Sequence, residues 1–175
     1  MGQLPALPSD RDLEIVTVRL KQMPMRSAHA AIMFPILSDA KLHEFTGGSP
    51  PSSEESLAEV YAARESRRSP DGKQLWLNWL IWQSEREEGV GFTQATVHPT
   101  HAYVAWVVGT QHQGLGYASE AATALVTWLA DLGVAEVQAC VHPEHTASRR
   151  VAQNAGLGLT KDFIDGEEVW AYRAP

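Results

Sequence analysis

The sequence predicts an α+β fold, in which a mostly antiparallel sheet contains one parallel strand–helix–strand unit. A chain of 175 residues, 44% of them hydrophobic, can form one domain with a buried core, so we expect a single domain over residues 1–175. Segments with strand alternation and segments with helical periodicity follow one another along the chain. Strand 102–108, helix 117–132 and strand 135–141 have the order of a right-handed crossover, so these two strands should be parallel.

The first part of the chain predicts a strand followed by a helix. Residues 14–23 alternate apolar and polar side chains, as a half-buried strand does. Residues 27–45 carry apolar side chains at helical spacing, and Pro35 interrupts that pattern. We therefore expect a helix that is broken at the proline.

A second helix is predicted after a loop rich in glycine, proline and serine. The loop GGSPPSSEES covers residues 47–56, and Ser52 with Glu55 fits a capping box at the start of the helix. The acidic, modestly amphipathic helix should run over residues 53–66, and a turn should follow at 69–73.

Three strands are predicted next. Residues 74–83 are rich in aromatic and β-branched side chains, and residues 89–97 and 102–108 are two further strands. The connection at 98–101 is short enough for a hairpin, so the last two strands should pair antiparallel. Strand alternation places three side chains of the first strand on one face, namely Trp76, Leu80 and Trp82.

The last part of the chain predicts two helices, a strand and a hairpin. Gly133 ends the helix 117–132, a helix over 146–156 follows the strand 135–141, and residues 159–173 form a hairpin that turns at Asp165 and Gly166. The packed face of the first helix should comprise Ala118, Ala121, Ala122, Leu125, Val126, Leu129 and Leu132. The side chains expected to point away from that face are Glu120, Thr123, Thr127 and Asp131.

Charge and composition argue against several classes of function. The formal net charge is −7 and the 14 Lys and Arg residues are scattered, so we expect no direct binding of nucleic acid. The most apolar run, residues 75–82, is far shorter than the roughly 20 residues that cross a bilayer, so we expect no membrane anchor. One cysteine cannot form an intrachain disulfide, and the first residues lack the features of a signal peptide, so we expect a cytoplasmic protein.

Two glycines, Gly114 and Gly116, lie between the strand 102–108 and the helix 117–132. The first N–H groups of a helix have no intrahelical partner and carry the positive end of the helix dipole, so they attract anions. Residues without Cβ let a phosphate oxygen approach the main chain closely. The segment is therefore a candidate phosphate cradle, and a tight strand-to-helix connection without a ligand is the alternative.

Two familiar nucleotide motifs fit this segment badly. A P-loop needs Gly-Lys-Ser/Thr where this loop continues Gly-Tyr-Ala, and a dinucleotide fingerprint needs a small residue at an offset that Ser119 meets poorly. The stretch QGLGYASEA, residues 113–121, instead resembles the acetyl-CoA pyrophosphate loop of the GCN5-related N-acetyltransferases (GNAT). The pattern Gln/Arg-x-x-Gly-x-Gly/Ala of that family is met by Gln113, Gly116 and Ala118.

Within that family, the stretch is especially similar to the ribosomal-protein alanine N-acetyltransferases, because this branch also accounts for Tyr117, Ser119 and Glu120. The later stretch HTASRRVAQNAGL, residues 145–157, resembles the Asn-x-x-Ser…Gly-Phe segment of the same branch. The predicted order of elements fits the family over nearly the whole chain. The resemblance implies a mixed, mostly antiparallel sheet flanked by helices, in which the two parallel strands splay apart to form an acyl-CoA cleft.

The resemblance implies a direct acyl transfer, in which an amine attacks the thioester carbonyl of acetyl-CoA. It also implies that the main chain of Trp106, Val107 and Val108 hydrogen-bonds the pantetheine arm like an added strand. Backbone N–H groups of the loop would hold the pyrophosphate. The loop residues in question are Gln113, Gly114, Leu115, Gly116, Tyr117, Ala118 and Ser119.

Acyl transfer needs an amine that is neutral when it attacks and a proton for the departing thiolate. Where some family members have a base carboxylate on the strand before the loop, this sequence has Tyr103, and where others have a tyrosine acid, it has Ala152. Ser148 matches a family serine whose hydroxyl could reach the CoA sulfur, and an ordinary first-turn residue is the alternative. His145 replaces the family asparagine, and it is either a base or a solvated loop histidine.

Two similar tetrads, HPTH at 98–101 and HPEH at 142–145, raise the question of a metal site with four imidazoles. The first tetrad precedes one strand and the second follows its parallel neighbour, so the two should lie at opposite ends of the sheet. We therefore expect no metal. Cys140 lies inside a predicted strand and is interpreted as a packed small apolar residue rather than as a nucleophile.

The sequence leaves the acceptor amine open. The branch resemblance favours a protein or peptide α-amine, whereas an acidic chain also suits a polyamine or an aminoglycoside. Among Trp76, Trp79 and Trp82, at least one side chain should face away from the core, where it lines an acceptor pocket or a dimer surface, or is simply packed. A homodimer is expected only by analogy with relatives. A sensor that binds acyl-CoA without turnover and a structural domain that binds no CoA are the other classes.

Overall fold

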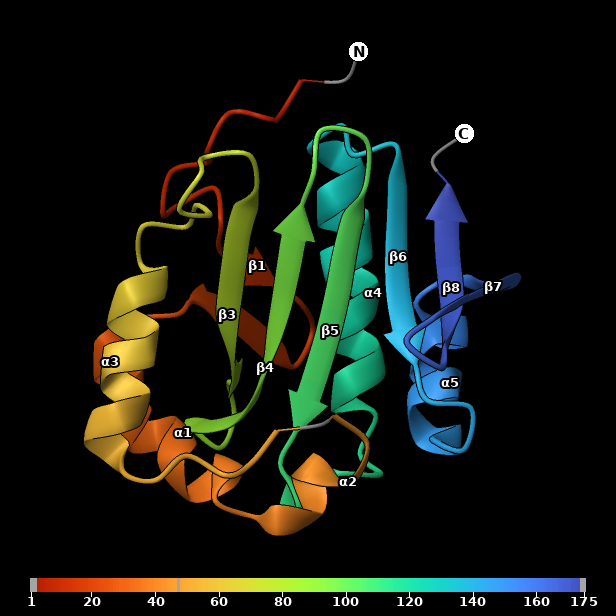
Figure 1. Cartoon of the computed structure of the whole chain (residues 1–175). Coiled ribbons are helices and arrows are strands. Elements are labelled where there is room, and N and C mark those ends of the chain that lie inside the picture. Colours follow the sequence, from red (N-terminus) through yellow and green to blue (C-terminus); the bar gives the residue numbers. More distant parts are fainter. Residues whose placement is uncertain (1–2, 47, 174–175) are drawn as a thin grey trace.

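The computed structural model describes residues 3–46 and 48–173 and contains an eight-stranded sheet (Figure 1). The strand order is β1-β2-β3-β4-β5-β6-β8-β7, and every neighbouring pair is antiparallel except β5 and β6. The strands are β1 (Ile15–Val16), β2 (Leu20–Pro24), β3 (Leu75–Gln83), β4 (Glu88–Val97), β5 (Ala102–Val108), β6 (Glu136–Val141), β7 (Gly158–Ile164) and β8 (Glu167–Arg173). The predicted α+β class and the single parallel pair are confirmed.

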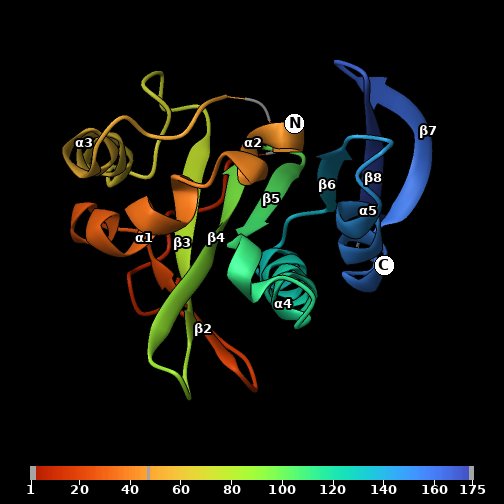
Figure 2. The ribbon, with the colours of Figure 1, turned by 90° about the horizontal axis from the view of Figure 1, so that it is seen from below.

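Helices cover both faces of the sheet, with α1 and α3 on one face and α4 and α5 on the other (Figure 2). The helices are α1 (Ala30–Leu37), α2 (His43–Thr46), α3 (Glu54–Arg64), α4 (Tyr117–Asp131) and α5 (Thr146–Asn154). Short 3₁₀ turns are η1 (Ser27–His29), η2 (Ala40–Leu42) and η3 (Thr110–His112). Within the described residues, none of these helices combines the length and the apolar character that a membrane crossing requires.

Strand alternation divides the core into two layers. Leu77 and Trp79 of β3 are buried in a large cluster with the apolar face of α4, whereas Leu80 is buried in a second cluster with α1 and α3. Trp82 packs against that second cluster, as the predicted common face with Leu80 requires. The fully buried Trp79 donates its indole N–H to the carbonyl of Leu13 at 2.6 Å, so its polar atom is satisfied inside the core.

Both predicted hairpins are confirmed. Strands β4 and β5 pair antiparallel across the tetrad at 98–101, and β7 and β8 pair across a turn at Asp165 and Gly166. Both turn residues have positive φ angles, 51° and 86°, which is the backbone geometry of a tight two-residue hairpin turn. Gly133, with φ of 89°, follows α4 as predicted.

The N-terminal strand differs from the prediction, because residues 14–23 form two short antiparallel strands instead of one. The chain turns at Thr17, whose hydroxyl accepts the N–H of Leu20 at 3.0 Å. Thr17 also donates its hydroxyl to the carboxylate of Glu120 on α4 at 2.6 Å. A contact with a distant helix therefore fixes a turn that the local alternation does not reveal.

The predicted break at Pro35 is wrong, because α1 continues through this residue to Leu37. Pro35 and Ala31, the residue four positions before it, are both exposed, so water can reach the carbonyl that the proline leaves unbonded. The helix ends at Leu37, and the C-cap is Ser38, whose hydroxyl donates to the carbonyl of Phe34 at 2.7 Å.

The predicted cap of α3 is displaced by one residue. Ser53, and not Ser52, is the N-cap, because its hydroxyl accepts the N–H of Ser56 at 3.1 Å and the hydroxyl of Ser56 accepts the N–H of Ser53. Ser56 therefore takes the role that the prediction gave to Glu55. Residue 47 of the preceding loop lies outside the described residues.

Candidate active site

The parallel strands β5 and β6 open into a cleft. They pair only at their beginnings, where Ala102 lies opposite Val137 and Tyr103 opposite Gln138. Figure 1 shows the two strands diverging toward their carboxyl ends, beside the start of α4. A cavity follows this opening and continues over the sheet toward α2 and α3.

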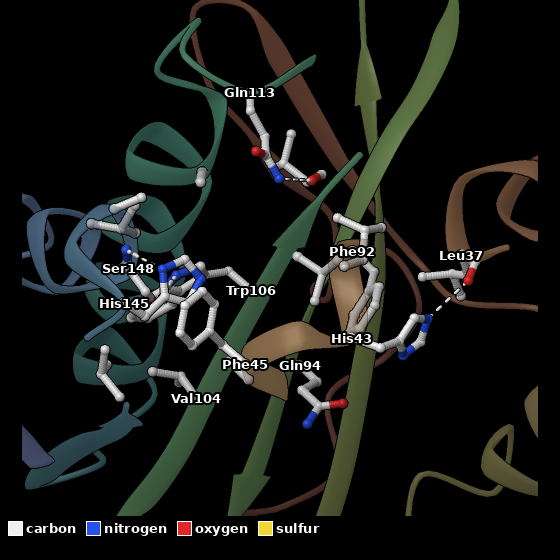
Figure 3. Close-up of a pocket in the computed structure, with 18 of the residues that line it drawn as sticks. Leu37, His43, Phe45, Phe92, Gln94, Val104, Trp106, Gln113, His145 and Ser148 are labelled. Atoms are coloured by element: carbon white, nitrogen blue, oxygen red, sulfur yellow. Dashed lines mark hydrogen bonds between the residues drawn. The ribbon is translucent and has the colours of Figure 1, made fainter. Parts of the chain in front are cut away.

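Most of the predicted site residues line this one cavity (Figure 3). Those that do are Tyr103, Trp106, Val107, Val108, Gln113, Gly114, Gly116, Tyr117, Ala118, Ser119, His145 and Ser148. Leu115 is not among the residues that line the cavity, and the residue is 43% exposed.

Both glycines of the loop have a backbone geometry that residues with a side chain rarely adopt. Gly114 and Gly116 have φ angles of 76° and 82°, in the left-handed region that disfavours side chains. Gly116 is also the N-cap of α4, so the free N–H groups of the first helical turn follow directly after it. A Cβ placed on Gly114 would meet nothing within 4 Å, which leaves open space beside the main chain. An anionic group such as a pyrophosphate fits this arrangement.

Arg19, from the turn between β1 and β2, holds the loop in place. Its guanidinium donates to the carbonyl of Leu115 at 2.9 Å and to the carboxylate of Glu120 at 2.7 Å, and it lies 4.9 Å from the ring centre of Tyr117. Glu120 was expected to point away from the packed face, but it also accepts from the hydroxyl of Thr17 and from the main-chain N–H of Arg19. Contacts with the β1–β2 turn therefore explain why this helix carries a half-buried acid.

Gln113 connects the beginning of the glycine loop to β5. Its amide donates to the carbonyl of Val108 at 3.1 Å, and Figure 3 shows this bond at the end of β5. The side chain therefore ties the beginning of the loop to the end of the strand. This bond supplies a structural reason for glutamine at the first position of the motif.

Ser148, at the start of α5, lies beside Trp106 of β5. The indole N–H of Trp106 donates to the hydroxyl oxygen of Ser148 at 3.1 Å. Because the oxygen accepts this bond, the hydroxyl proton of Ser148 is free to be donated toward the cavity. The contact spans the opening between the two parallel strands.

His145 is not the solvated loop residue that one of the two sequence interpretations expected, because it is half-buried and is the N-cap of α5. Its Nδ1 accepts the N–H of Ser148 at 3.4 Å, and its ring centre lies 4.5 Å from that of Phe45. Burial lowers the pKa of His145, the neighbouring His142 lowers it further, and Glu44 opposes both effects. The acceptor role of Nδ1 places the proton of the neutral ring on Nε2.

Tyr103 lies at the beginning of β5, at the opposite end of the strand from the glycine loop. Its ring contacts His98 and His101 edge-on, at centroid distances of 5.8 and 5.0 Å. Tyr103 is three positions before Trp106, so the two α-carbons are about 10 Å apart along the strand and the two side chains point to opposite faces of the sheet. The contacts of its ring are with the two histidines of the first tetrad, whereas Trp106 contacts Ser148.

The two histidine tetrads lie at opposite ends of the sheet, as predicted. His98 and His101 stack on each other at 4.5 Å before β5, whereas His142 and His145 both contact Phe45 after β6. Across the described residues, no group of three or more His, Cys, Asp or Glu side chains has the geometry of a metal site. The half-buried Cys140 lines the cavity, and burial raises the pKa of its thiol.

The end of the cavity near α3 contains polar groups that the sequence analysis missed. Tyr61 of α3, Asn78 of β3 and Gln94 of β4 all line it. Asn78 and Gln94 lie directly opposite each other in the strand register. Strand alternation could have placed these two amides on a common face, but no local signal points to Tyr61.

Comparison with known proteins identifies the family. A family model described as an acetyltransferase (GNAT) domain matches residues 19–158. No curated protein sequence matches the chain.

Three solved structures share the fold. RimJ from Mycobacterium smegmatis, in complex with CoA-disulfide, is 19% identical with a TM-score of 0.75, over 98% of this chain and 90% of that one. RimL, a ribosomal L7/L12 α-N-protein acetyltransferase in complex with coenzyme A, is 18% identical with a TM-score of 0.76, over 91% and 97%. The aminoglycoside acetyltransferase AAC(6')-Ib, in complex with coenzyme A, is 16% identical with a TM-score of 0.71, over 88% and 94%.

The sheet with its single parallel pair, the cleft beside the glycine loop and the family match lead to one assignment. The chain belongs to the GNAT acetyltransferases.

Proposed function

We propose that this enzyme transfers the acetyl group of acetyl-CoA to the α-amine at the N-terminus of a protein or peptide. The observation that carries the proposal is the position of the Ser148 hydroxyl. It lies in the same cavity as the glycine loop and is held by the indole of Trp106. A proton donor, Ser148, and an anion cradle, the glycine loop, therefore lie beside the same opening between β5 and β6.

The cradle binds the pyrophosphate of acetyl-CoA in this proposal. Open space beside Gly114 and the free N–H groups at the start of α4 suit a phosphate, and a side chain at either glycine would be strained. The pantetheine arm then follows the end of β5, where the main chain of Trp106, Val107 and Val108 has no parallel partner in β6. The thioester reaches the neighbourhood of Ser148.

The transfer is a single substitution at the acetyl carbonyl. The neutral amine nitrogen bonds to the carbonyl carbon, the carbon–sulfur bond breaks, and the thiolate takes the hydroxyl proton of Ser148. Ser148 regains a proton as the new amide nitrogen loses its extra one, so atoms and charge balance. His145 orients the first turn of α5 through its bond to the Ser148 N–H, and it is a positioning residue in this scheme.

Charge in the cavity favours a peptide over an aminoglycoside. Among the described residues that line it, the only carboxylates are Glu44 and Glu167, against the cations Lys41, Arg64 and Arg150. An aminoglycoside carries several ammonium groups, which a site without a surplus of carboxylates stabilises poorly. A peptide N-terminus presents one amine followed by neutral amide groups.

The test is a thiol-release assay with acetyl-CoA and four acceptors: an alanyl tripeptide amide, n-propylamine, spermidine and kanamycin. We expect the highest kcat/KM with the tripeptide amide. In Ser148→Ala, kcat should fall about 100-fold because the proton donor is lost, and calorimetry should give an unchanged Kd for acetyl-CoA.

The control is Ser84→Ala, which removes an exposed hydroxyl in the turn between β3 and β4 and should keep full activity. Binding of acetyl-CoA without turnover of any amine would contradict the transferase proposal and support a sensor. A higher kcat/KM with kanamycin or spermidine would contradict the peptide acceptor.

A further inference from the structure

Tyr61 of α3 carries a buried hydroxyl without a partner. The residue is 6% exposed, and its oxygen has no hydrogen-bond partner within the part of the chain that the structure describes. Its ring belongs to the apolar cluster between α3 and the sheet, beside Met25 and Leu57. Burial raises the pKa of Tyr61 to about 12, although Arg64 acts in the opposite direction, so the phenol stays protonated at neutral pH. It is a neutral O–H donor.

A buried donor without an acceptor costs free energy, so a bound molecule or an ordered water that supplies the acceptor is stabilising. Tyr61 lines the same cavity as the glycine loop and Ser148. A bound acceptor molecule with an oxygen at this position would therefore recover a hydrogen bond that the free protein lacks.

Two amides lie on the floor of the same part of the cavity. Asn78 donates one N–H to the carbonyl of Trp76 at 3.3 Å, and no partner of its side-chain oxygen is found among the described residues. The side-chain amide of Gln94 likewise has no hydrogen-bond partner in that part of the chain. Figure 3 shows this amide projecting from β4, with Phe92 on the same strand. The floor therefore offers neutral donors and acceptors.

The register places these amides in a row that leads away from the reaction centre. Asn78 lies opposite Gln94, and Gln94 lies opposite Ala105, which precedes Trp106 on β5. Neighbouring strands are about 4.8 Å apart, so the row spans about 10 Å from β5 to β3. An extended peptide covers that distance with about three residues. The row lies on the sheet face of Leu80 and Phe92, whereas Trp106 packs against the cluster of α4 on the other face. The amine would therefore reach Ser148 through the opening between β5 and β6, while the carbonyls of the peptide cross the row.

We propose that Tyr61, Asn78 and Gln94 form a subsite for the uncharged carbonyl and amide groups of an acceptor peptide, beyond its reactive amine. The subsite rests on the proposed transferase function and names what the acceptor must carry. It selects an amine followed by a peptide backbone over a simple monoamine, which has no group to place there, and over a polyamine, which places a second cation there.

The test compares Tyr61→Phe with wild type, and Tyr172→Phe serves as the matched control. The control removes a phenol hydroxyl from β8, outside the residues that line the cavity. In Tyr61→Phe, we expect KM for the alanyl tripeptide amide to rise about tenfold, as the loss of one hydrogen bond to a neutral group predicts. The KM for n-propylamine and the Kd for acetyl-CoA should not change.

Thermal stability supplies a second measurement, because the substitution should weaken peptide binding without lowering the unfolding temperature. Because the hydroxyl has no partner in the free protein, Tyr61→Phe should unfold at the same temperature as wild type or at a higher one. A lower Tm with an unchanged peptide KM would overturn the subsite, since it would mean that the hydroxyl holds a structural water.

Turnover assays of the wild-type enzyme distinguish failure of the subsite from failure of the proposed function. Absence of turnover with every amine would overturn both. Turnover of the tripeptide amide with the same KM in wild type and Tyr61→Phe would overturn the subsite alone, and the transferase proposal would stand.

Discussion

The two ends of the cavity are built differently. The end beside α4 is formed by main-chain groups and glycines from one continuous segment, which runs from the end of β5 into the helix. The end beneath α3 is formed by side chains from separate elements, Tyr61 of α3, Asn78 of β3 and Gln94 of β4. The first end suits the pyrophosphate of the proposed acetyl-CoA, and the second suits the proposed acceptor.

Because the two ends are built from different groups, substitutions can affect one end without the other. A change at the glycine loop alters the main-chain donors. It should weaken the binding of any ligand with a pyrophosphate, whichever acceptor is used. A change at Tyr61 alters one side chain and should act on the acceptor alone. Ligands that possess or lack the pyrophosphate can test this separation.

Arg19→Gln should have the larger effect, which is a loss of affinity for acetyl-CoA. The substitution removes the bond to the carbonyl of Leu115 and leaves the Glu120 carboxylate uncompensated in the first turn of α4. Loss of one charge-assisted hydrogen bond predicts an affinity for acetyl-CoA that is about tenfold weaker. Kinetics with S-acetylpantetheine, which lacks the pyrophosphate, should not change, because Arg19 acts only through the loop.

Two further variants control this prediction. Lys21→Gln removes an exposed cation of β2, paired with Glu14 at 2.9 Å, and should leave the acetyl-CoA affinity unchanged. Glu120→Gln in the Arg19→Gln background removes the uncompensated charge and should recover part of the affinity. An equal loss with S-acetylpantetheine would mean that Arg19 supports the fold and has no specific effect on the pyrophosphate end.

A smaller effect is expected for the pH dependence of stability in His145→Asn. The lowered pKa of His145, caused first by burial and then by His142, favours the neutral ring in the folded state. The unfolded chain binds a proton near pH 6.5, so wild type should lose stability as the pH falls from about 6.5 through the lower folded pKa. Asparagine caps helices well and does not titrate, so the variant should escape this part of the loss.

The check is thermal unfolding of both proteins between pH 8 and pH 5. The Tm of His145→Asn should equal or exceed that of wild type at pH 8, and its advantage should grow toward pH 5. A Tm difference that stays constant over this range would contradict the lowered pKa.

The features that sequence could predict are those encoded locally. Glycines with positive φ mark the loop, the turn at Asp165 and Gly166, and the end of α4, and each of them is a departure from ordinary backbone geometry that only a few residues tolerate. The apolar periodicity of α4 and the short connection between β4 and β5 likewise need only neighbouring residues. The crossover topology then follows from chirality.

The features that sequence could not predict are contacts between distant segments. Arg19 and Glu120 are 101 positions apart, and Trp106 and Ser148 are 42 positions apart. The local pattern predicts that Glu120 is a surface residue of an amphipathic helix. Only the folded structure shows that the turn at Thr17 lies beside it. The role of Tyr61 depends on the absence of a partner, which only a three-dimensional arrangement reveals.

The most direct test of the phosphate cradle is calorimetric titration of acetyl-CoA into wild type, Gly116→Val and Gly166→Val. Both variants force a β-branched residue into the left-handed backbone region, at φ of 82° and 86°, so they carry a similar strain. We expect Gly116→Val to lose measurable binding and Gly166→Val, in the β7–β8 turn, to bind as wild type does. Equal binding by all three proteins, or absence of binding by wild type, would contradict the phosphate cradle at the start of α4.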